Sequence, residues 1–315
     1  MKVFSMGEMV IDFLPGDGTG VYIRKPGGAP ANLAVSMARL GAEAEFCGMM
    51  GNDDFGRFLV KTLEENNVKP CVRELTDAAT TTLAFVTLDE SGDRSFTFAR
   101  KPGADMFLTK EMVENCFPED ADIVHAGSCS LSKAAAGQAT RRALEMGAQR
   151  GKLVSFDINY RGAFWDENYD AACAGIGEIL KWVDLLKLSD EEIDMLGGED
   201  KLPELMAQEN IALTVMTRGA KGARCYWNGR VLEVPGVKSE CVDTCGAGDA
   251  FWGGFLATLL RLGVRKGADL TEEILLECMR MGNVAGALCV RKKGAIESLP
   301  TWDMIEESRK EMYAE

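Results

Sequence analysis

Residues 242–262 contain, in this order, a glycine turn, one carboxylate and a long apolar run. Such a segment could take part in the transfer of a phosphoryl group. The turn is Gly246-Ala247-Gly248-Asp249, and the helix-forming run after it continues to Leu262, where Gly263 is placed to end it. Free N–H groups at the positive end of a helix suit a phosphate. Asp249 would repel that phosphate unless it takes a proton from an attacking hydroxyl. The motif therefore indicates phosphoryl transfer from a nucleotide to an alcohol.

A second candidate motif is Gly27-Gly28-Ala29-Pro30-Ala31-Asn32, far from the first along the chain. Two glycines let a ligand approach the backbone closely, and the Asn32 amide can donate to and accept from sugar hydroxyls. Taken alone, the stretch also fits a plain glycine turn before a helix, and that simpler interpretation is slightly favoured. Only the combination with the Gly246–Asp249 turn makes a sugar site the better hypothesis.

The composition is ordinary for a soluble globular enzyme. The 315 residues are 46% hydrophobic and 27% charged, with a net charge of −14 and no basic block, which argues against nucleic acid and anionic membranes as partners. No apolar run reaches membrane-spanning length, and Glu8 and Asp12 interrupt any signal-peptide core. Ten scattered cysteines and a single histidine, His125, make a zinc site improbable and predict a reducing cytoplasm.

Short apolar runs alternate with helical ones, which predicts an α/β fold. The expected strands are Lys2–Met6, Ala44–Met49, Ile123–Ala126, Leu153–Asp157, Leu185–Leu188 and Leu213–Thr217. The expected helices include Ala31–Leu40, Asp54–Asn66, Ala134–Arg150 and Glu191–Leu196. Several strands end in polar or glycine-containing loops. Because ligands bind outside the carboxyl ends of strands in open α/β sheets, these loops should line one crevice.

Two segments interrupt the alternation and read as β-structure. Residues 80–89 and 94–100 flank the polar turn Glu90–Asp93, which predicts a hairpin, and residues 13–25 lack helical periodicity. We expect these pieces, about 13–26 and 80–102, to form a small β-sheet lid over the crevice. No linker divides the chain, so we expect a single domain over residues 1–315.

The two glycine motifs together closely resemble the signatures of the ribokinase (PfkB-type) carbohydrate kinases, and the resemblance covers almost the whole chain. Within that family, four stretches look like bacterial fructokinases, namely Met6–Phe13, Gly28–Asn32, Phe85–Asp89 and Arg94–Phe98. The resemblance implies a three-layer ribokinase-like α/β fold with a mostly parallel central sheet and a small β-sheet lid. It also implies ATP as phosphoryl donor, with Mg²⁺ and with K⁺ as a further ion.

The resemblance assigns the acceptor side of the site. Asp249 would be the general base, and the amides of Gly246, Ala247 and Gly248 would stabilise the charge on the transferred group. Sugar hydroxyls would be held by Asp12, Gly27, Gly28, Asn32 and Asn159. Arg161 would bridge sugar and phosphate, although Ile158 replaces the family's usual proline in Asp157-Ile158-Asn159-Tyr160-Arg161. Arg100, at the end of the lid hairpin, either reaches a keto-sugar oxygen or only decorates the lid, and contact is slightly favoured.

The nucleotide side of the site follows from the same resemblance. Lys187 would reach the phosphates, and Glu192 would organise Mg²⁺ through water, with Ser189 replacing the family's usual asparagine. The remaining nucleotide residues are Thr217, Gly219, Gly222 and Asn283, the last of which could equally be a plain polar helix residue. Asp243, Gly294 and Ser298 match positions around a potassium site, where backbone carbonyls are the main ligands.

These features favour an ATP-dependent kinase for the primary hydroxyl of a keto-hexose, above all D-fructose giving fructose 6-phosphate. Ketodeoxygluconate, ribose and a nucleoside or aminoimidazole riboside remain alternative substrates. A non-catalytic sugar-binding regulatory relative is a rival of another class. A nicotinamide-dependent oxidoreductase is disfavoured, because no Gly-x-Gly-x-x-Gly follows the first strand. Open edges on the lid strands predict a homodimer formed through the lid. Cys245, beside the glycine turn, has no assigned role.

Overall fold

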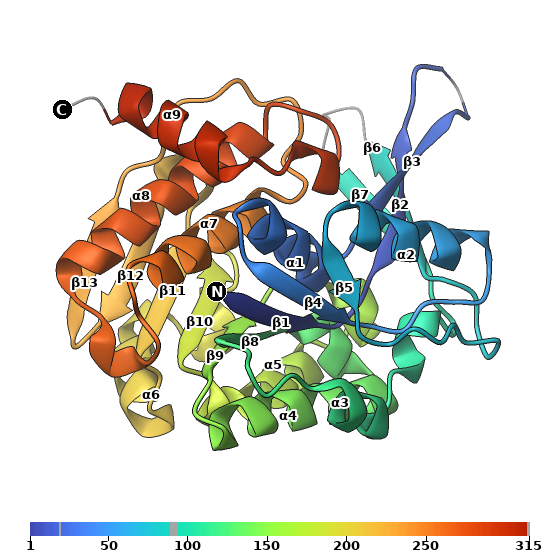
Figure 1. Ribbon diagram of the computed structural model, residues 1–315, viewed down its shortest axis with the longest axis horizontal. Helices are drawn as coiled ribbons and strands as arrows, with labels where there is room; N and C mark the ends of the chain where they lie inside the picture. The colour runs from blue at the N-terminus through green and yellow to red at the C-terminus, as the bar shows by residue number, and fades with distance from the viewer. Residues whose placement is uncertain (19, 89–93, 314–315) are drawn as a thin grey trace.

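The computed structural model describes residues 1–18, 20–88 and 94–313, and a nine-stranded sheet runs through its centre (Figure 1). The strand order is β13-β12-β11-β10-β9-β8-β1-β4-β5. The strands from β11 to β5 in this order pair in parallel, and β12 and β13 form an antiparallel edge. The strands are β1 (Lys2–Met6), β4 (Glu43–Cys47), β5 (Val68–Pro70), β8 (Ile123–Gly127), β9 (Leu153–Asp157), β10 (Leu185–Ser189), β11 (Leu213–Thr217), β12 (Ala223–Trp227) and β13 (Arg230–Val234).

Helices cover both faces of this sheet, which gives three layers. In Figure 1, α1, α2, α7, α8 and α9 lie above the sheet, and α3, α4, α5 and α6 lie below it. The helices above are α1 (Ala29–Arg39), α2 (Asp54–Glu65), α7 (Ala247–Arg261), α8 (Glu272–Cys289) and α9 (Trp302–Met312). Those below are α3 (Lys110–Cys116), α4 (Ala134–Gln149), α5 (Tyr169–Gly177) and α6 (Leu202–Glu209). The expected three-layer fold with a mostly parallel sheet is therefore confirmed.

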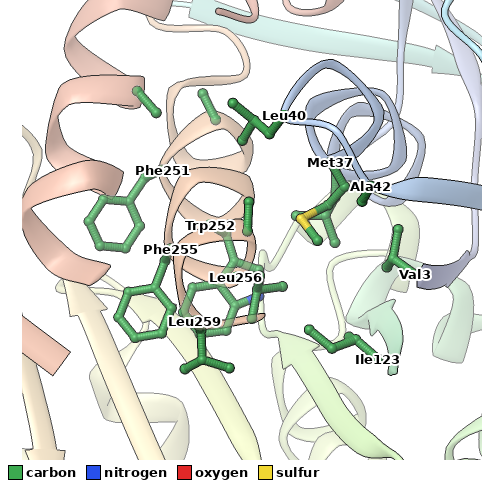
Figure 2. Close-up of a cluster of buried hydrophobic side chains, with 14 of the residues drawn as sticks. Val3, Met37, Leu40, Ala42, Ile123, Phe251, Trp252, Phe255, Leu256 and Leu259 are labelled. Carbon is green, nitrogen blue, oxygen red and sulfur yellow. The ribbon is translucent and has the colours of Figure 1, made fainter. Parts of the chain in front are cut away.

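Helix α7 is the most buried helix of the upper layer, because its residues are apolar almost all round. Figure 2 shows Trp252 and Leu256 pointing toward α1 and the sheet, with Phe251 and Phe255 on the side of α8. The rings of Trp252 and Phe255 stack with centroids 4.9 Å apart. The indole Nε1 of Trp252 donates to Oγ of Ser155 on β9 at 2.8 Å. This packing fixes the start of α7 relative to the central strands.

A second, four-stranded sheet stands beside the main one, in the order β3-β2-β6-β7 (Figure 1). Its strands are β2 (Val10–Pro15), β3 (Tyr22–Gly27), β6 (Leu83–Leu88) and β7 (Arg94–Ala99). β2 pairs in parallel with β6, and the outer pairs β2–β3 and β6–β7 are antiparallel. The two predicted β segments thus join in one sheet, although β2 begins at Val10 rather than Phe13. The predicted turn Glu90–Asp93 lies outside the described residues.

The expected strands of the main sheet are all present, with boundaries that agree within two residues. The helix expected over Glu191–Leu196 is wrong, because only Ile193–Leu196 forms a short 3-10 helix. There the carboxylate of Glu192 binds backbone N–H groups, which competes with helix formation. In the part of the chain that the structure describes, no helix has both the length and the apolar character needed to cross a membrane.

Candidate functional site

The glycine turn before α7 has the conformation that its sequence predicts. Gly246 has φ of 75°, a left-handed value that favours glycine, and a Cβ there would lie 2.8 Å from the Cβ of Ala295. The helix begins at Ala247, so Asp249 falls in its first turn. The first N–H groups of α7 therefore have no partner within the helix, and this end carries the positive pole of the helix dipole.

Asp249 is a half-buried carboxylate held by a single amide. Nδ2 of Asn32, from the first turn of α1, donates to Oδ2 of Asp249 at 2.7 Å. Burial raises the pKa of Asp249, and the Asn32 hydrogen bond together with the positive charges of Lys187 and Arg161 limits that rise. Oδ1 of Asn32 is buried and has no partner among the described residues. The two glycine motifs thus meet at one hydrogen bond, with an acceptor oxygen left for a ligand.

A cavity of about 130 Å³ opens at this hydrogen bond. It brings together the predicted residues Asp12, Gly28, Asn32, Asn159, Arg161, Gly246 and Asp249. A larger cavity of about 490 Å³ lies between α6 and the strands β12 and β13, and it contains none of the predicted site residues. We take the smaller cavity as the candidate site, because it joins Asp249, the Asn32 amide and the N-terminus of α7.

Two glycines on the acceptor side are required by close contacts. A Cβ on Gly27 would lie 2.1 Å from Oδ2 of Asp12, and a Cβ on Gly28, whose φ is 108°, would lie 2.5 Å from the carbonyl oxygen of Glu8. Any side chain at Gly27 would therefore displace the Asp12 carboxylate. Burial raises the pKa of Asp12 to about 7, while Arg161 acts in the opposite direction. The pKa of Asp12 therefore lies well above that of an ordinary aspartate.

Lys187 brings a buried positive charge to the start of α7. Its Nζ forms an ion pair with Oδ2 of Asp157 at 2.7 Å, and both side chains are buried. A Cβ on Gly248 would lie 3.4 Å from that Nζ, so the ammonium group stands directly against the turn. Burial alone would lower the pKa of Lys187, but Asp157 and Glu192 reverse the effect and raise it. The group therefore stays charged beside the helix N-terminus.

Glu192 links the loops that follow β9 and β10. Its Oε1 accepts from the backbone N–H of Tyr160 at 2.6 Å, and its Oε2 accepts from that of Ser189 at 2.8 Å. Ser189 contributes its backbone rather than its hydroxyl to this link. Each carboxylate oxygen has a further lone pair, so the side chain is able to bind a hydrated cation while it holds the loops.

Asp243, Gly294 and Ser298 come together behind the glycine turn. The two carboxylate oxygens of Asp243 accept from the backbone N–H groups of Cys245, at 2.7 Å, and Gly294, at 2.9 Å. The hydroxyl of Ser298 in turn donates to the carbonyl oxygen of Gly294 at 2.5 Å. This network ties Cys245, the residue before Gly246, to the segment from Gly294 to Ser298.

Several predicted residues do not line the cavity. Arg100 is buried and donates twice to Oδ2 of Asp105, at 2.8 and 2.6 Å, with its guanidinium 4.2 Å from the ring centre of Phe164. Thr217, Gly219 and Gly222 lie at the end of β11 and in the turn that follows. Asn283 donates to the carbonyl oxygen of Pro235 at 3.0 Å, so its amide is engaged in packing α8.

The cavity also contains residues that the sequence did not single out. Glu8, Phe98, Cys129 and Phe164 are among its lining residues. Glu8 follows β1, as a site residue of an α/β fold should, and that position was the signal that could have identified it. Phe98 and Phe164 carry no comparable signal, because isolated aromatic residues are usually core residues. Their rings meet edge to face with centroids 4.9 Å apart.

The site thus combines a carboxylate at a helix N-terminus, a buried lysine and a small polar cavity, which are the groups that the sequence predicted for phosphoryl transfer to an alcohol. The pfkB family carbohydrate kinase profile matches residues 2–302, and the chain belongs to that family. The family assignment made from the two glycine motifs is thereby confirmed.

The chain is also similar to individual family members over almost its whole length. It is 39% identical to fructokinase-2 of Zea mays over 95% of this chain and 91% of the other. The structure of fructokinase with bound ATP from Xylella fastidiosa has a TM-score of 0.90 at 32% identity and covers 100% and 99% of the two chains. Fructokinase from Vibrio cholerae O395, with fructose, ADP and calcium ion bound, has a TM-score of 0.87 at 34% identity over 97% and 98%.

Proposed function

We propose that this protein transfers the terminal phosphoryl group of ATP to the primary hydroxyl of D-fructose, giving fructose 6-phosphate. The observation that carries the proposal is the Asn32–Asp249 hydrogen bond at the start of α7, inside a cavity that also contains Asp12 and Arg161. Fructose is favoured as acceptor because the relatives are fructokinases and one of them holds fructose together with ADP.

In this mechanism Asp249 accepts the proton of the attacking hydroxyl. Its raised pKa strengthens it as a base, while Asn32 keeps the carboxylate oriented and ionised. The N–H groups of Gly246, Ala247 and Gly248 would stabilise the charge that develops on the transferred group, although that of Ala247 also donates to the carbonyl oxygen of Thr244 at 3.2 Å. Asp12, Gly27, Gly28, Asn32 and Asn159 bind the sugar, and Arg161 neutralises charge between sugar and phosphate.

ATP is proposed to lie along the carboxyl ends of β10 and β11. Lys187 stands against Gly248 and is able to reach a phosphate there, although a phosphate must compete with Asp157 for it. Ser189, Thr217, Gly219 and Gly222 occupy the adjoining strand ends, where backbone groups can approach the nucleotide. Asn283 would border the adenine from α8 while it keeps its bond to Pro235.

Two cations fit the residues present. Glu192 would hold Mg²⁺ through water, since both of its oxygens already accept backbone N–H bonds and only further lone pairs remain. When bound, Mg²⁺ neutralises phosphate charge. K⁺ would lie beside Asp243, Gly294 and Ser298, whose hydrogen bonds hold Cys245, the residue before Gly246. A double mutant of the Vibrio enzyme has been solved with fructose, ADP and potassium ion bound, which supports this second ion.

The small sheet is proposed to act as a lid of a single kinase domain, because β2, β3 and β7 contribute or adjoin residues of the sugar cavity. Its edge strand β3 begins beside Val21 and includes Tyr22 and Ile23, whose side chains are 49%, 44% and 41% exposed. Exposed apolar residues on a sheet edge favour pairing with a second copy, so we infer a homodimer. None of the ten cysteines, all of which lie among the described residues, forms a disulfide, which supports a cytoplasmic location.

A coupled assay of ADP release tests the proposal across fructose, ketodeoxygluconate, ribose, adenosine and aminoimidazole riboside. Fructose should give the highest kcat/KM, and Asp249→Asn should lower kcat on that sugar by at least about 10²-fold. The Asp184→Asn variant is the control, because Asp184 is a half-buried carboxylate of the larger cavity and accepts from the backbone N–H of Val154, away from the proposed base. A well-folded Asp249→Asn variant with near-normal turnover would overturn the role of Asp249, and a preference for another sugar would overturn fructose.

A further inference from the structure

Glu8 is a buried carboxyl group in the lining of the sugar cavity. It lies in the short loop between β1 and β2, and Gly28 packs closely against its backbone carbonyl oxygen. The side chain is 4% exposed, and its Oε2 has no hydrogen-bond partner among the described residues. A buried polar group without a partner costs free energy, so its presence calls for an explanation.

The polar groups around Glu8 are already engaged with one another. Arg100 directs Nε and Nη2 to Oδ2 of Asp105. Thr82 donates its hydroxyl to the other oxygen of the same carboxylate. The Cys129 thiol points to the carbonyl oxygen of Asn159 at 3.7 Å. Both oxygens of Asp105 thus accept from residues at the two ends of the β6–β7 hairpin, and the free oxygen of Glu8 remains available to a ligand.

The charge state of Glu8 suits a neutral ligand. Burial raises the pKa of Glu8 to about 8, to which the charges of Asp105 and Asp249 add and which Arg100 opposes. At neutral pH the group is therefore mostly a carboxylic acid, with one O–H donor and a carbonyl acceptor. Burial also raises the pKa of the neighbouring Cys129 thiol, which stays protonated over the same range.

We propose that Glu8 is a sugar-binding residue whose carboxyl group hydrogen-bonds a hydroxyl of the acceptor sugar other than the one that reacts. The proposal rests on the sugar kinase function given above. Asp249 and Asn32 hold the reacting end of the sugar, and Glu8 selects for a polar group elsewhere on it. A site built to bind a hydroxyl rejects analogues that lack it, because its own polar group is then left unpaired.

Two variants separate this role from a purely structural one. Glu8→Gln keeps the size, the donor and the acceptor but has no ionisable proton. Glu8→Ala removes all three. With fructose at pH 7, Glu8→Ala should raise KM for the sugar at least 10-fold and leave kcat and KM for ATP within about threefold of wild type. Glu8→Gln should keep all three constants within about threefold of wild type.

The pH dependence supplies a readout that a structural role would not move. KM for fructose of the wild-type enzyme should rise from pH 7 to pH 9, as Glu8 loses its proton and its donor. It should rise less in Glu8→Gln over the same range, where only the other groups of the cavity, Asp12 among them, still titrate. Asp249, Asp105 and Arg100 are the other charged groups near Glu8, and the difference between the two enzymes removes any titration that they share.

Steady-state kinetics on the purified enzyme between pH 6.5 and 9 decide the matter, with sugar binding without ATP followed by tryptophan fluorescence. Equal pH dependence in wild type and Glu8→Gln would overturn the proposal, as would a sugar KM for Glu8→Ala within twofold of wild type. If Glu8→Ala does not fold, the comparison with Glu8→Gln stands alone. Wild-type kcat reports on the proposed function and the ratio of KM values reports on Glu8, so the two can fail separately.

Discussion

The Asn32–Asp249 hydrogen bond predicts how the enzyme depends on pH. Only the ionised form of Asp249 can accept a proton, so kcat/KM should fall as the pH drops through its pKa. Because burial raises that pKa, the acid limb should lie above the range of an ordinary aspartate. Asn32 stabilises the ionised form through its 2.7 Å hydrogen bond, and Asn32→Ala should therefore move the limb to higher pH.

The size of this movement follows from the strength of the bond. A hydrogen bond to a charged group contributes about 1.5 to 3 kcal/mol. At about 1.4 kcal/mol for each pKa unit, its loss corresponds to a rise of about 1 to 2 units. The assay is kcat/KM for fructose between pH 5 and 9 in wild type and Asn32→Ala.

Asn159→Ala is the matched control for this experiment. Asn159 lines the same cavity, but among the described residues it is not a hydrogen-bond partner of Asp249. Its loss should lower kcat/KM at every pH without moving the midpoint. An unchanged midpoint in Asn32→Ala, or an equal movement in both variants, would refute the role given to the hydrogen bond.

Three further predictions concern the fold and the surroundings of the site. Asp105→Ala leaves the buried Arg100 unpaired, which costs about 3 to 5 kcal/mol, and for 315 residues at roughly 2.1 cal/mol/K each the Tm should fall by about 5 to 8 °C. The double variant Arg100→Met/Asp105→Ala removes the unpaired charge and should regain part of the lost Tm. A Tm for Asp105→Ala within 2 °C of wild type, together with no higher Tm in the double variant, would contradict this. Alkylation of the half-buried Cys245, whose backbone N–H binds Asp243, should inactivate the enzyme with protection by ATP, and Cys245→Ser should abolish the sensitivity. If that variant is inactivated as fast as wild type, the thiol is elsewhere. Ile23→Lys on β3 should shift sedimentation from dimer to monomer, and a wild-type monomer at micromolar concentration would count against the interface.

The sequence was sufficient for the parts of the site that depend on local rules. A helix N-terminus with glycine before it and a carboxylate in its first turn is a local pattern, and Gly246 and Asp249 lie as predicted. The alternation of short strands and helices likewise has a local cause in hydrophobic periodicity. These rules explain why β1, β9 and β11 were predicted residue by residue.

Residues whose partners are not related by any spacing rule were not predicted. Arg100 was expected to contact sugar or solvent, yet it binds Asp105, five residues ahead, under the small sheet. Three of the scattered cysteines provide another example. The Sγ atoms of Cys47 and Cys116 lie 3.6 Å apart, and the Cys71 thiol lies 3.3 Å from Glu45 nearby. No spacing rule relates such positions, because tertiary packing alone brings them together.

The join between the small sheet and helix α1 leaves almost no slack. β3 stays paired with β2 up to Gly27, and α1 begins at Ala29, so a single residue, Gly28, separates the sheet from the helix that carries Asn32. A tilt of β3 must therefore be transmitted to the first turn of α1 and to its bond with Asp249. The pKa of Asp249 is therefore coupled to the position of the small sheet, and a displacement of that sheet would change it.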